Sequence, residues 1–391
     1  MSLPAIPRSS GDDYASPAVD GRRTLCERAA GRPLPHLAGK SVAPQEARGK
    51  IENLIGFTQV PLGIAGPLLV DTHQGPREVY VPMATTEGAM VASYSRGMKV
   101  LTAAGNARAR VVHEGLTQHP VLVYPDVASA ERARSSVEGM LEEFERLTAE
   151  TTSHGSLVHV AAELAGRRLV LCLTFATGDA IGINMAARAT DACARRLAER
   201  TAPEAYYVHG EDVEKRANAR ALHEGRGRSV ACDALIPAKL LEQHLRVTAA
   251  QLVAIHRTYE VGFARLATQN HLVQSANGLA AVFLACGQDV AYVTESATGL
   301  LDMDLRSSGD LYVSVQLPSM LVGTVGGGTG QGTAAECLDV LGVRGNGGAN
   351  LFAEILAATV LAGDLSLLAS FCTHEFVAAH ERLGRNRPGA R

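Results

Sequence analysis

The sequence contains no tryptophan, and aromatic residues make up only 4% of its 391 residues. Surfaces that bind single-stranded nucleic acid stack the bases on aromatic side chains, so this shortage argues against such a surface. The formal net charge is −3, which provides no overall attraction to nucleic acid or to an anionic membrane. The composition therefore favours neither nucleic acid nor a membrane as a partner.

The sequence also lacks paired cysteines and long apolar runs. Its seven cysteines are scattered, and no C-x-x-C pair occurs among them, so we expect free thiols in a reducing compartment and no zinc site. No run of about twenty apolar residues, the length of a membrane span, is found, and the N-terminus has no apolar signal-peptide core. We therefore predict a cytoplasmic protein without metal or membrane segment.

What remains is the composition of a globular protein with a large core, since 46% of the residues are hydrophobic and 20% are charged. The stretch Ala276–Tyr292, ANGLAAVFLACGQDVAY, is apolar without strict alternation and is predicted to be a buried core helix. Asp289 stands near its end. A buried carboxylate is costly unless it meets a partner, and the simpler alternative is that Asp289 reaches solvent.

Hydrophobic periodicity predicts alternating helices and strands along the chain. We expect helices at Thr85–Leu101, Ala128–Glu150, Gly182–Glu199, Ala238–Thr258, Thr333–Leu341 and Asn350–Leu383, the last with a break near Gly363. We expect strands at Val79–Pro82, Leu157–Val160, Arg168–Ala176, Val230–Pro237 and Asp310–Leu317. The succession of elements over roughly 111–208 indicates a compact α+β unit.

Two glycine-containing segments lie between a predicted strand and a predicted helix. GTVGGGTGQG (Gly323–Gly332) matches neither a P-loop nor the G-x-G-x-x-G fingerprint. It is either a tight structural connection or a place where backbone approaches a ligand. In GDAIGIN (Gly178–Asn184), Asp179 either caps a helix or belongs to a turn whose N–H groups bind an anion.

Single ionisable residues are ambiguous when taken alone. Glu87 stands at a predicted helix start, where a carboxylate is common because of the helix dipole. Lys215 lies in a charged loop, and such lysines are usually only solvated. His380 lies on the last predicted helix, where a histidine is more often a surface residue than a catalyst.

Seven ordered motifs remove this ambiguity: ENLIG, PLGIAGPL, PMATTEGAMVAS, GDAIGINM, EGRGRSV, CGQD and GTVGGGT. In this order the chain resembles the 3-hydroxy-3-methylglutaryl-CoA (HMG-CoA) reductase family over roughly residues 45–387. PLGIAGPL and TTEG-x-x-VAS resemble the eukaryotic and archaeal type, class I, more than the bacterial catabolic type. The family reduces a thioester to an alcohol with two hydrides from a nicotinamide and releases CoA.

The resemblance implies four catalytic residues. Glu87 lies in TTEG, Lys215 precedes EGRG, Asp289 ends CGQD, and His380 follows GDLSL. A cation such as Lys215 would stabilise the oxyanion that hydride attack creates, and Asp289 beside it would keep it charged. A histidine suits protonation of the leaving thiolate, and a glutamic acid suits proton donation to the aldehyde intermediate.

The resemblance also implies ligand contacts, with NADPH as cofactor and NADH as its alternative. Dinucleotide contacts are expected from Ser153, His154, Asp179, Ile181, Gly182, Asn184, Gly326, Gly327 and Gly328. CoA and acyl contacts are expected from Ser93, Arg96, Arg110, Arg216 and Asn277. His154 stands where an arginine is usual and is a weaker, pH-dependent phosphate ligand.

The fold class implied is α+β, with a large domain around a central buried helix and an inserted, ferredoxin-like dinucleotide-binding domain. The expected segments are an N-terminal arm (1–45), the large CoA-binding domain (46–110 and 209–366), the small domain (111–208) and a C-terminal flap (367–391). Glu52–Gly56 carries the family's interface motif, so we expect a homodimer or a tetramer with active sites shared between subunits.

Two segments depart from the family pattern, namely 209–222 around the lysine and the bulkier 262–275 before the core helix. Both are expected to surround the substrate. The alternatives are therefore a reductase of another acyl-CoA or carrier-bound thioester, and a non-catalytic homologue that binds acyl-CoA. Retention of all four catalytic residue types argues against the second.

Overall fold

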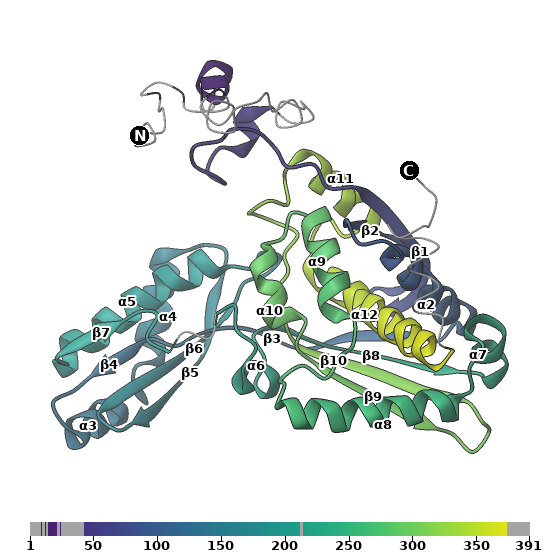
Figure 1. Ribbon diagram of the computed structural model, residues 1–391. Helices are drawn as coiled ribbons and strands as arrows, with labels where there is room; N and C mark the ends of the chain where they lie inside the picture. The colour runs from purple at the N-terminus through teal and green to yellow at the C-terminus, as the bar shows by residue number, and fades with distance from the viewer. Residues whose placement is uncertain are drawn as a thin grey trace, which may run out of the picture.

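The computed structural model describes residues 43–211 and 214–373, with 15–21 and positions 9, 12 and 24 before them. Over these residues the protein is mixed α and β, and its ten strands join in one sheet (Figure 1). The strands are β1 (Leu62–Thr72), β2 (Gly75–Ala84), β3 (Arg108–Gln118), β4 (Val121–Val123), β5 (Ser156–Ala165), β6 (Arg168–Ala176), β7 (Ala205–Tyr207), β8 (Gly227–Ile236), β9 (Leu300–Leu305) and β10 (Leu311–Met320). The helices are α2 (Met90–Ala104), α3 (Val127–Val137), α4 (Leu141–Thr151), α5 (Ile183–Thr201), α6 (Ala219–His223), α7 (Ala238–Leu245), α8 (Ala249–Leu266), α9 (Ser275–Ala285), α10 (Val293–Ser296), α11 (Gly332–Leu341) and α12 (Gly348–Cys372).

Strand β3 belongs to both parts of the molecule. Most of its length pairs with β8 in the large part, whereas its last residues, Leu116–Gln118, pair with β6 in the small part. The small part has the element order β4-α3-α4-β5-β6-α5-β7 and the antiparallel strand order β7-β4-β6-β5. This is the split βαβ arrangement of ferredoxin-like units, as expected for an α+β insertion, and it projects to one side in Figure 1.

Helix α12 is the long buried helix of the large part (Figure 1). It is long and apolar enough to cross a membrane, but 83% of its apolar window is buried inside the protein. The sequence analysis predicted a helix here but found no apolar run of membrane-spanning length, because Glu354 and Asp364 interrupt the run. The central helix is therefore α12, and the stretch predicted from Ala276 to Tyr292 forms only the shorter α9 and a 3-10 turn.

The predicted break near Gly363 is wrong, because α12 continues through it to Cys372. A Cβ at Gly363 would lie 2.4 Å from a ring carbon of Tyr94, and one at Gly97 would lie 1.9 Å from the carbonyl oxygen of Ala362. Gly97 therefore lets α2 approach the backbone of α12, and Gly363 leaves room for the Tyr94 ring of α2. Gly363 is therefore explained by close packing between helices and not by a break in α12.

Other predicted boundaries were also wrong. The helix expected from Thr85 starts at Met90, and Ala128–Glu150 forms two helices, α3 and α4. Ala238–Thr258 divides at Arg246, which has a left-handed backbone, before a capping box of Thr248 and Gln251 starts α8. Strand β1 was missed because its glycine and proline produce a register shift within an otherwise regular strand.

Candidate active site

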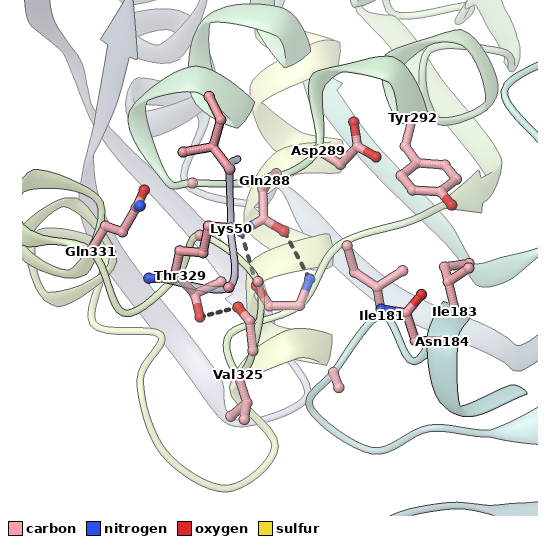
Figure 2. Close-up of a pocket in the computed structure, with 18 of the residues that line it drawn as sticks. Lys50, Ile181, Ile183, Asn184, Gln288, Asp289, Tyr292, Val325, Thr329 and Gln331 are labelled. Carbon is pink, nitrogen blue, oxygen red and sulfur yellow. Dashed lines mark hydrogen bonds between the residues drawn. The ribbon is translucent and has the colours of Figure 1, made fainter. Parts of the chain in front are cut away.

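A cavity of about 1040 Å³ lies where the two parts of the molecule meet the segment that follows the N-terminal arm. Its walls come from segments far apart in the sequence, and Figure 2 labels side chains from all of them except the loop of Lys215. The lining residues lie within 47–58, 180–187, 287–292 and 323–331, together with residues 209, 214 and 215. The cavity therefore brings together the two glycine-containing segments and the loop of the predicted catalytic lysine.

Lys215 and Asp289 meet at this cavity. The Nζ atom of Lys215 lies 3.0 Å from Oδ2 of Asp289, and the two side chains remain 43% and 47% exposed. Nζ also lies 4.9 Å from the centre of the Tyr292 ring, within the range of a cation–π contact. Asp289 accepts a hydrogen bond from the Ala291 N–H at 3.0 Å. The contact between lysine and aspartate expected from the sequence is thus present within one chain.

The backbone of Lys215 is held by residues that the sequence analysis missed. Its N–H donates to Glu295 Oε1 at 2.5 Å, and Glu295 pairs in turn with Arg226. Arg226 also pairs with Glu214 at 2.8 Å, and the Tyr292 hydroxyl donates to Glu214 at 3.2 Å. Burial raises the pKa of Glu295 and of Tyr292. Arg226 lies in the quoted EGRGRSV motif, but its partners are too distant in sequence to be recognised.

The glycine-rich segment and the 178–184 turn lie side by side at the cavity. Ala180 and Val325 form a parallel bridge, and Gln288 bonds both the N–H and the carbonyl of Gly323, at 2.9 and 3.0 Å (Figure 2). The expected dinucleotide residues that line the cavity are Ile181, Gly182, Asn184, Gly326, Gly327 and Gly328. The structure therefore gathers six of the nine residues expected to contact the dinucleotide.

The other three lie elsewhere. Asp179 accepts hydrogen bonds from the N–H groups of Gly347 and Ala349, at 3.0 and 2.9 Å, so it caps α12 and does not line the cavity. Ser153 and His154 lie at the exposed turn between α4 and β5, where Ser153 Oγ is 2.7 Å from His154 Nδ1.

The acyl and CoA residues expected from the sequence form a second cluster beside α2. Glu87 lies in the turn before α2, exposed, and accepts a long hydrogen bond of 3.4 Å from Asn277 on α9. Arg96 donates to the Ser366 hydroxyl at 3.0 Å and to its carbonyl at 2.5 Å. Ser93 lies 3.1 Å from the same hydroxyl. None of these residues lines the main cavity.

Arg110 and Arg216 lie outside both groups. Arg110 pairs with Asp71 at 2.7 Å and borders a separate groove of about 490 Å³ on the sheet. Arg216 is exposed directly after Lys215. His380 lies outside the described residues.

A buried carboxylate supports the start of α9. Asp364 on α12 is fully buried and accepts hydrogen bonds from the N–H groups of Val273 and Gln274, at 2.9 and 2.7 Å. Burial raises its pKa to about 6, against the opposing effect of those hydrogen bonds. Gln274 also accepts from the Tyr94 hydroxyl at 2.6 Å. Asp364 therefore fixes the chain between α8 and α9, next to Asn277.

Comparisons with known proteins agree with this geometry. The family described as hydroxymethylglutaryl-coenzyme A reductase matches residues 18–385. The 3-hydroxy-3-methylglutaryl-coenzyme A reductase of Haloferax volcanii is 39% identical over 378 residues, covering 95% of this chain and 94% of that protein. The reductase of Methanothermobacter thermautotrophicus is 38% identical over 372 residues, covering 94% of each.

Solved structures confirm the fold. A 3-hydroxy-3-methylglutaryl-coenzyme A reductase of Streptococcus pneumoniae has a TM-score of 0.70 at 20% identity and covers 93% of this chain and 87% of that one. The class II enzyme from the same species, bound to NADPH in open conformations, has a TM-score of 0.68 at 22% identity, with coverage of 84% and 79%. With the match to nearly the whole length of the archaeal reductases, the chain belongs to the hydroxymethylglutaryl-coenzyme A reductase family.

Proposed function

We propose that the protein reduces HMG-CoA to mevalonate and free CoA, with two molecules of NADPH as hydride donors. The observation that carries the proposal is the Lys215–Asp289 contact at 3.0 Å, in a cavity that also contains both glycine segments. The relatives named above, matched over 94% of their length, support the same substrate.

The residues at the cavity fit a dinucleotide. Gly326 and Gly327 have positive φ, with open space where a Cβ would stand, so backbone can approach a ligand closely there. Gly182 precedes α5, and the first residues of that helix, Ile183 and Asn184, line the cavity. The first N–H groups of a helix favour phosphate. When bound, NADPH would supply hydride, and these residues would hold its phosphates.

The protein residues would handle charge and protons. Hydride addition to the thioester carbonyl leaves negative charge on oxygen, which Lys215 stabilises. Collapse of this adduct expels the CoA thiolate, and a proton from His380 converts it to the thiol. Hydride addition to the resulting aldehyde, with a proton from Glu87, gives the alcohol. Asp289 holds the Lys215 ammonium in place throughout.

The separation between Glu87 and the main cavity supports shared active sites. We infer a homodimer or tetramer, in which the Glu52–Gly56 segment meets a second copy and brings the α2 cluster to a neighbouring cavity. Leu62, Ile64 and Tyr80 on the β1–β2 hairpin are each at least half exposed, and this apolar surface supports such an interface.

Further features of the proposal follow from the family membership. The boundaries remain those proposed above, with the arm (1–45), large domain (46–110 and 209–366), small domain (111–208) and flap (367–391), although α12 extends to Cys372. The archaeal relatives support assignment to class I. A cytoplasmic location is consistent with the burial of α12.

Steady-state oxidation of NADPH and NADH tests the proposal, with HMG-CoA and a panel of other acyl-CoA thioesters as substrates. Turnover of HMG-CoA with two cofactors consumed per CoA released is the expected result. Turnover of another thioester alone would identify a changed substrate, for which the altered segments 209–222 and 262–275 would be responsible. Absence of turnover with every thioester would overturn the reductase function.

A further inference from the structure

The backbone of Lys215 adopts an unusual conformation at the cavity. Its φ is +57°, in the left-handed region that favours glycine over other residues. Such a conformation persists only where the surroundings enforce it. The contact that does so is the hydrogen bond of 2.5 Å from the Lys215 N–H to Glu295 Oε1.

Glu295 is itself immobilised. Its side chain is 0% exposed, and both carboxylate oxygens lie 3.2 Å from Arg226 Nη1. Arg226, which is 2% exposed, donates further to Glu214 Oε1 at 2.8 Å and to the Thr117 carbonyl at 3.1 Å. Buried ion pairs hold fixed geometries because each partner pays a large cost on separation. The acceptor for the lysine N–H is therefore anchored to β3 and β8.

The neighbours of Lys215 depend on the same anchor. Tyr292, whose ring faces Nζ at 4.9 Å, donates its hydroxyl to Glu214 at 3.2 Å. Glu214 is the residue before Lys215 and pairs with Arg226. The lysine backbone and its aromatic neighbour are thus both fixed through one arginine.

We propose that Glu295, held by Arg226, is a positioning residue for Lys215, which fixes the lysine backbone so that Nζ meets Asp289 and the reacting carbonyl. This inference rests on the proposed reductase function for its kinetic consequence, because Lys215 acts there on the developing oxyanion. A displaced cation loses stabilisation of the transition state more than binding of the cofactor.

Steady-state kinetics of two variants at Glu295 test its positioning role. We expect E295A to lower kcat on the order of 100-fold, since a small misplacement of a catalytic group has effects of that size. E295Q retains an acceptor for the lysine N–H and should recover part of the loss. KM for NADPH should stay unchanged in both. E224Q is the matched control, because Glu224 pairs with Arg220 at 3.0 Å on the surface, and it should behave as the wild type.

A double variant guards against simple misfolding. R226Q/E295Q removes both buried charges, and its loss of kcat should be smaller than the product of the losses in R226Q and E295Q, because the two residues act as one unit. If E295A, E295Q and R226Q lower only the melting temperature, with kcat equal to that of E224Q, the pair is merely structural and the proposal fails.

Hydrogen–deuterium exchange gives a readout that needs no activity. In the wild type the Lys215 N–H should exchange slowly, and E295A should abolish that protection while the peptides of α5 stay unchanged. A protection loss in a protein that reduces no thioester would refute the proposed function and leave the positioning role standing. Fast exchange at Lys215 in the wild type would refute the positioning role, whatever the activity.

Discussion

Gly287 and Gly328 pack backbone against backbone at the wall of the cavity. A Cβ at Gly328 would lie 2.5 Å from the carbonyl oxygen of Gly287, and a Cβ at Gly287 would lie 2.5 Å from that of Gly328. Gly287 stands two residues before Asp289, and Gly328 belongs to the segment proposed to hold the dinucleotide. The position of Asp289, the proposed catalytic aspartate, is thus coupled directly to the proposed dinucleotide segment.

This contact predicts that G328A weakens both stability and cofactor binding. The added methyl group forces the two segments apart, and overpacking of this kind typically costs about 1–3 kcal/mol. Chemical denaturation should show the lower free energy of unfolding, and fluorescence titration should show a higher Kd for NADPH. G330A is the control, because a Cβ there meets no atom within 4 Å. Equal behaviour of the two variants would contradict the coupling.

Replacing Lys215 by methionine should abolish reduction while leaving the fold intact. Removing the cation forfeits oxyanion stabilisation, and loss of one such group lowers kcat by about 100- to 1,000-fold. Stability should change by no more than about 1 kcal/mol, because exposed ion pairs contribute little. The measurement is NADPH oxidation with HMG-CoA, alongside thermal denaturation. K239M, an exposed lysine on α7, should keep wild-type turnover; a matching loss there would contradict the assignment.

Asp364 predicts a stability that falls as the pH rises. Burial raises its pKa from 3.8 to about 6 in the folded protein, so the native state binds more protons than the unfolded state between these values. The stability advantage is complete below about pH 4 and is lost through about pH 6, by about 3 kcal/mol. Urea denaturation across this range should show that the stability of the wild type relative to D364N grows by about 3 kcal/mol as the pH falls from about 6 to about 4.

The control for Asp364 is D339N on α11, whose carboxylate is 60% exposed beside Arg344. It should retain the wild-type slope. A stability difference between wild type and D364N that does not change with pH would show that Asp364 is not responsible.

His119 predicts the opposite pH dependence of stability, over a pH range that overlaps that of Asp364. It lies between β3 and β4, neither ring nitrogen has a hydrogen-bond partner, and burial, with Arg220 and Arg226 nearby, lowers its pKa to about 4. Because only the unfolded state binds a proton between about pH 6.5 and 4, stability falls as the pH falls, by about 3 kcal/mol. In H119L this loss should disappear in urea denaturation, whereas H223L, at an exposed histidine, should keep it.

The two groups partly cancel in the wild type, so the single variants separate them. H119L should become more stable relative to wild type as the pH falls, and D364N less stable. A wild-type curve that matches both variants would show that neither group titrates as described.

The motifs allowed the family, the α+β class and the pairing of Lys215 with Asp289 to be predicted, because each motif carries its chemistry in a few adjacent residues. The residues that hold Lys215 in place could not be predicted. Arg226 and Glu295 are 69 positions apart, and nothing in either segment marks the other as its partner.

The contacts of Gly363 and Asp179 were missed for a related reason. Gly363 was interpreted as a break because a glycine in isolation disfavours a helix, whereas its function is to let Tyr94 approach. Asp179 was expected near the dinucleotide, and its role at the start of α12 depends on residues 168 and 170 positions later. Local pattern determines local structure, and these contacts are not local.

Cofactor preference provides the last test, at the turn of Ser153 and His154. The resemblance places this turn at the extra phosphate of NADPH, and His154 stands there in place of an arginine, with Nδ1 2.7 Å from Ser153 Oγ. An arginine carries a fixed charge and can bind a phosphate through two N–H groups, which a histidine cannot do. H154R should therefore raise the ratio of kcat/KM for NADPH to that for NADH about 10-fold, since a hydrogen bond between charged groups contributes about 1.5–3 kcal/mol. H159R, at the fourth residue of the adjacent β5, is the control for added charge and should leave the ratio unchanged. If H154R and the wild type show the same ratio, the phosphate lies elsewhere, and the fit of the dinucleotide would rest on the glycine segments and α5 alone.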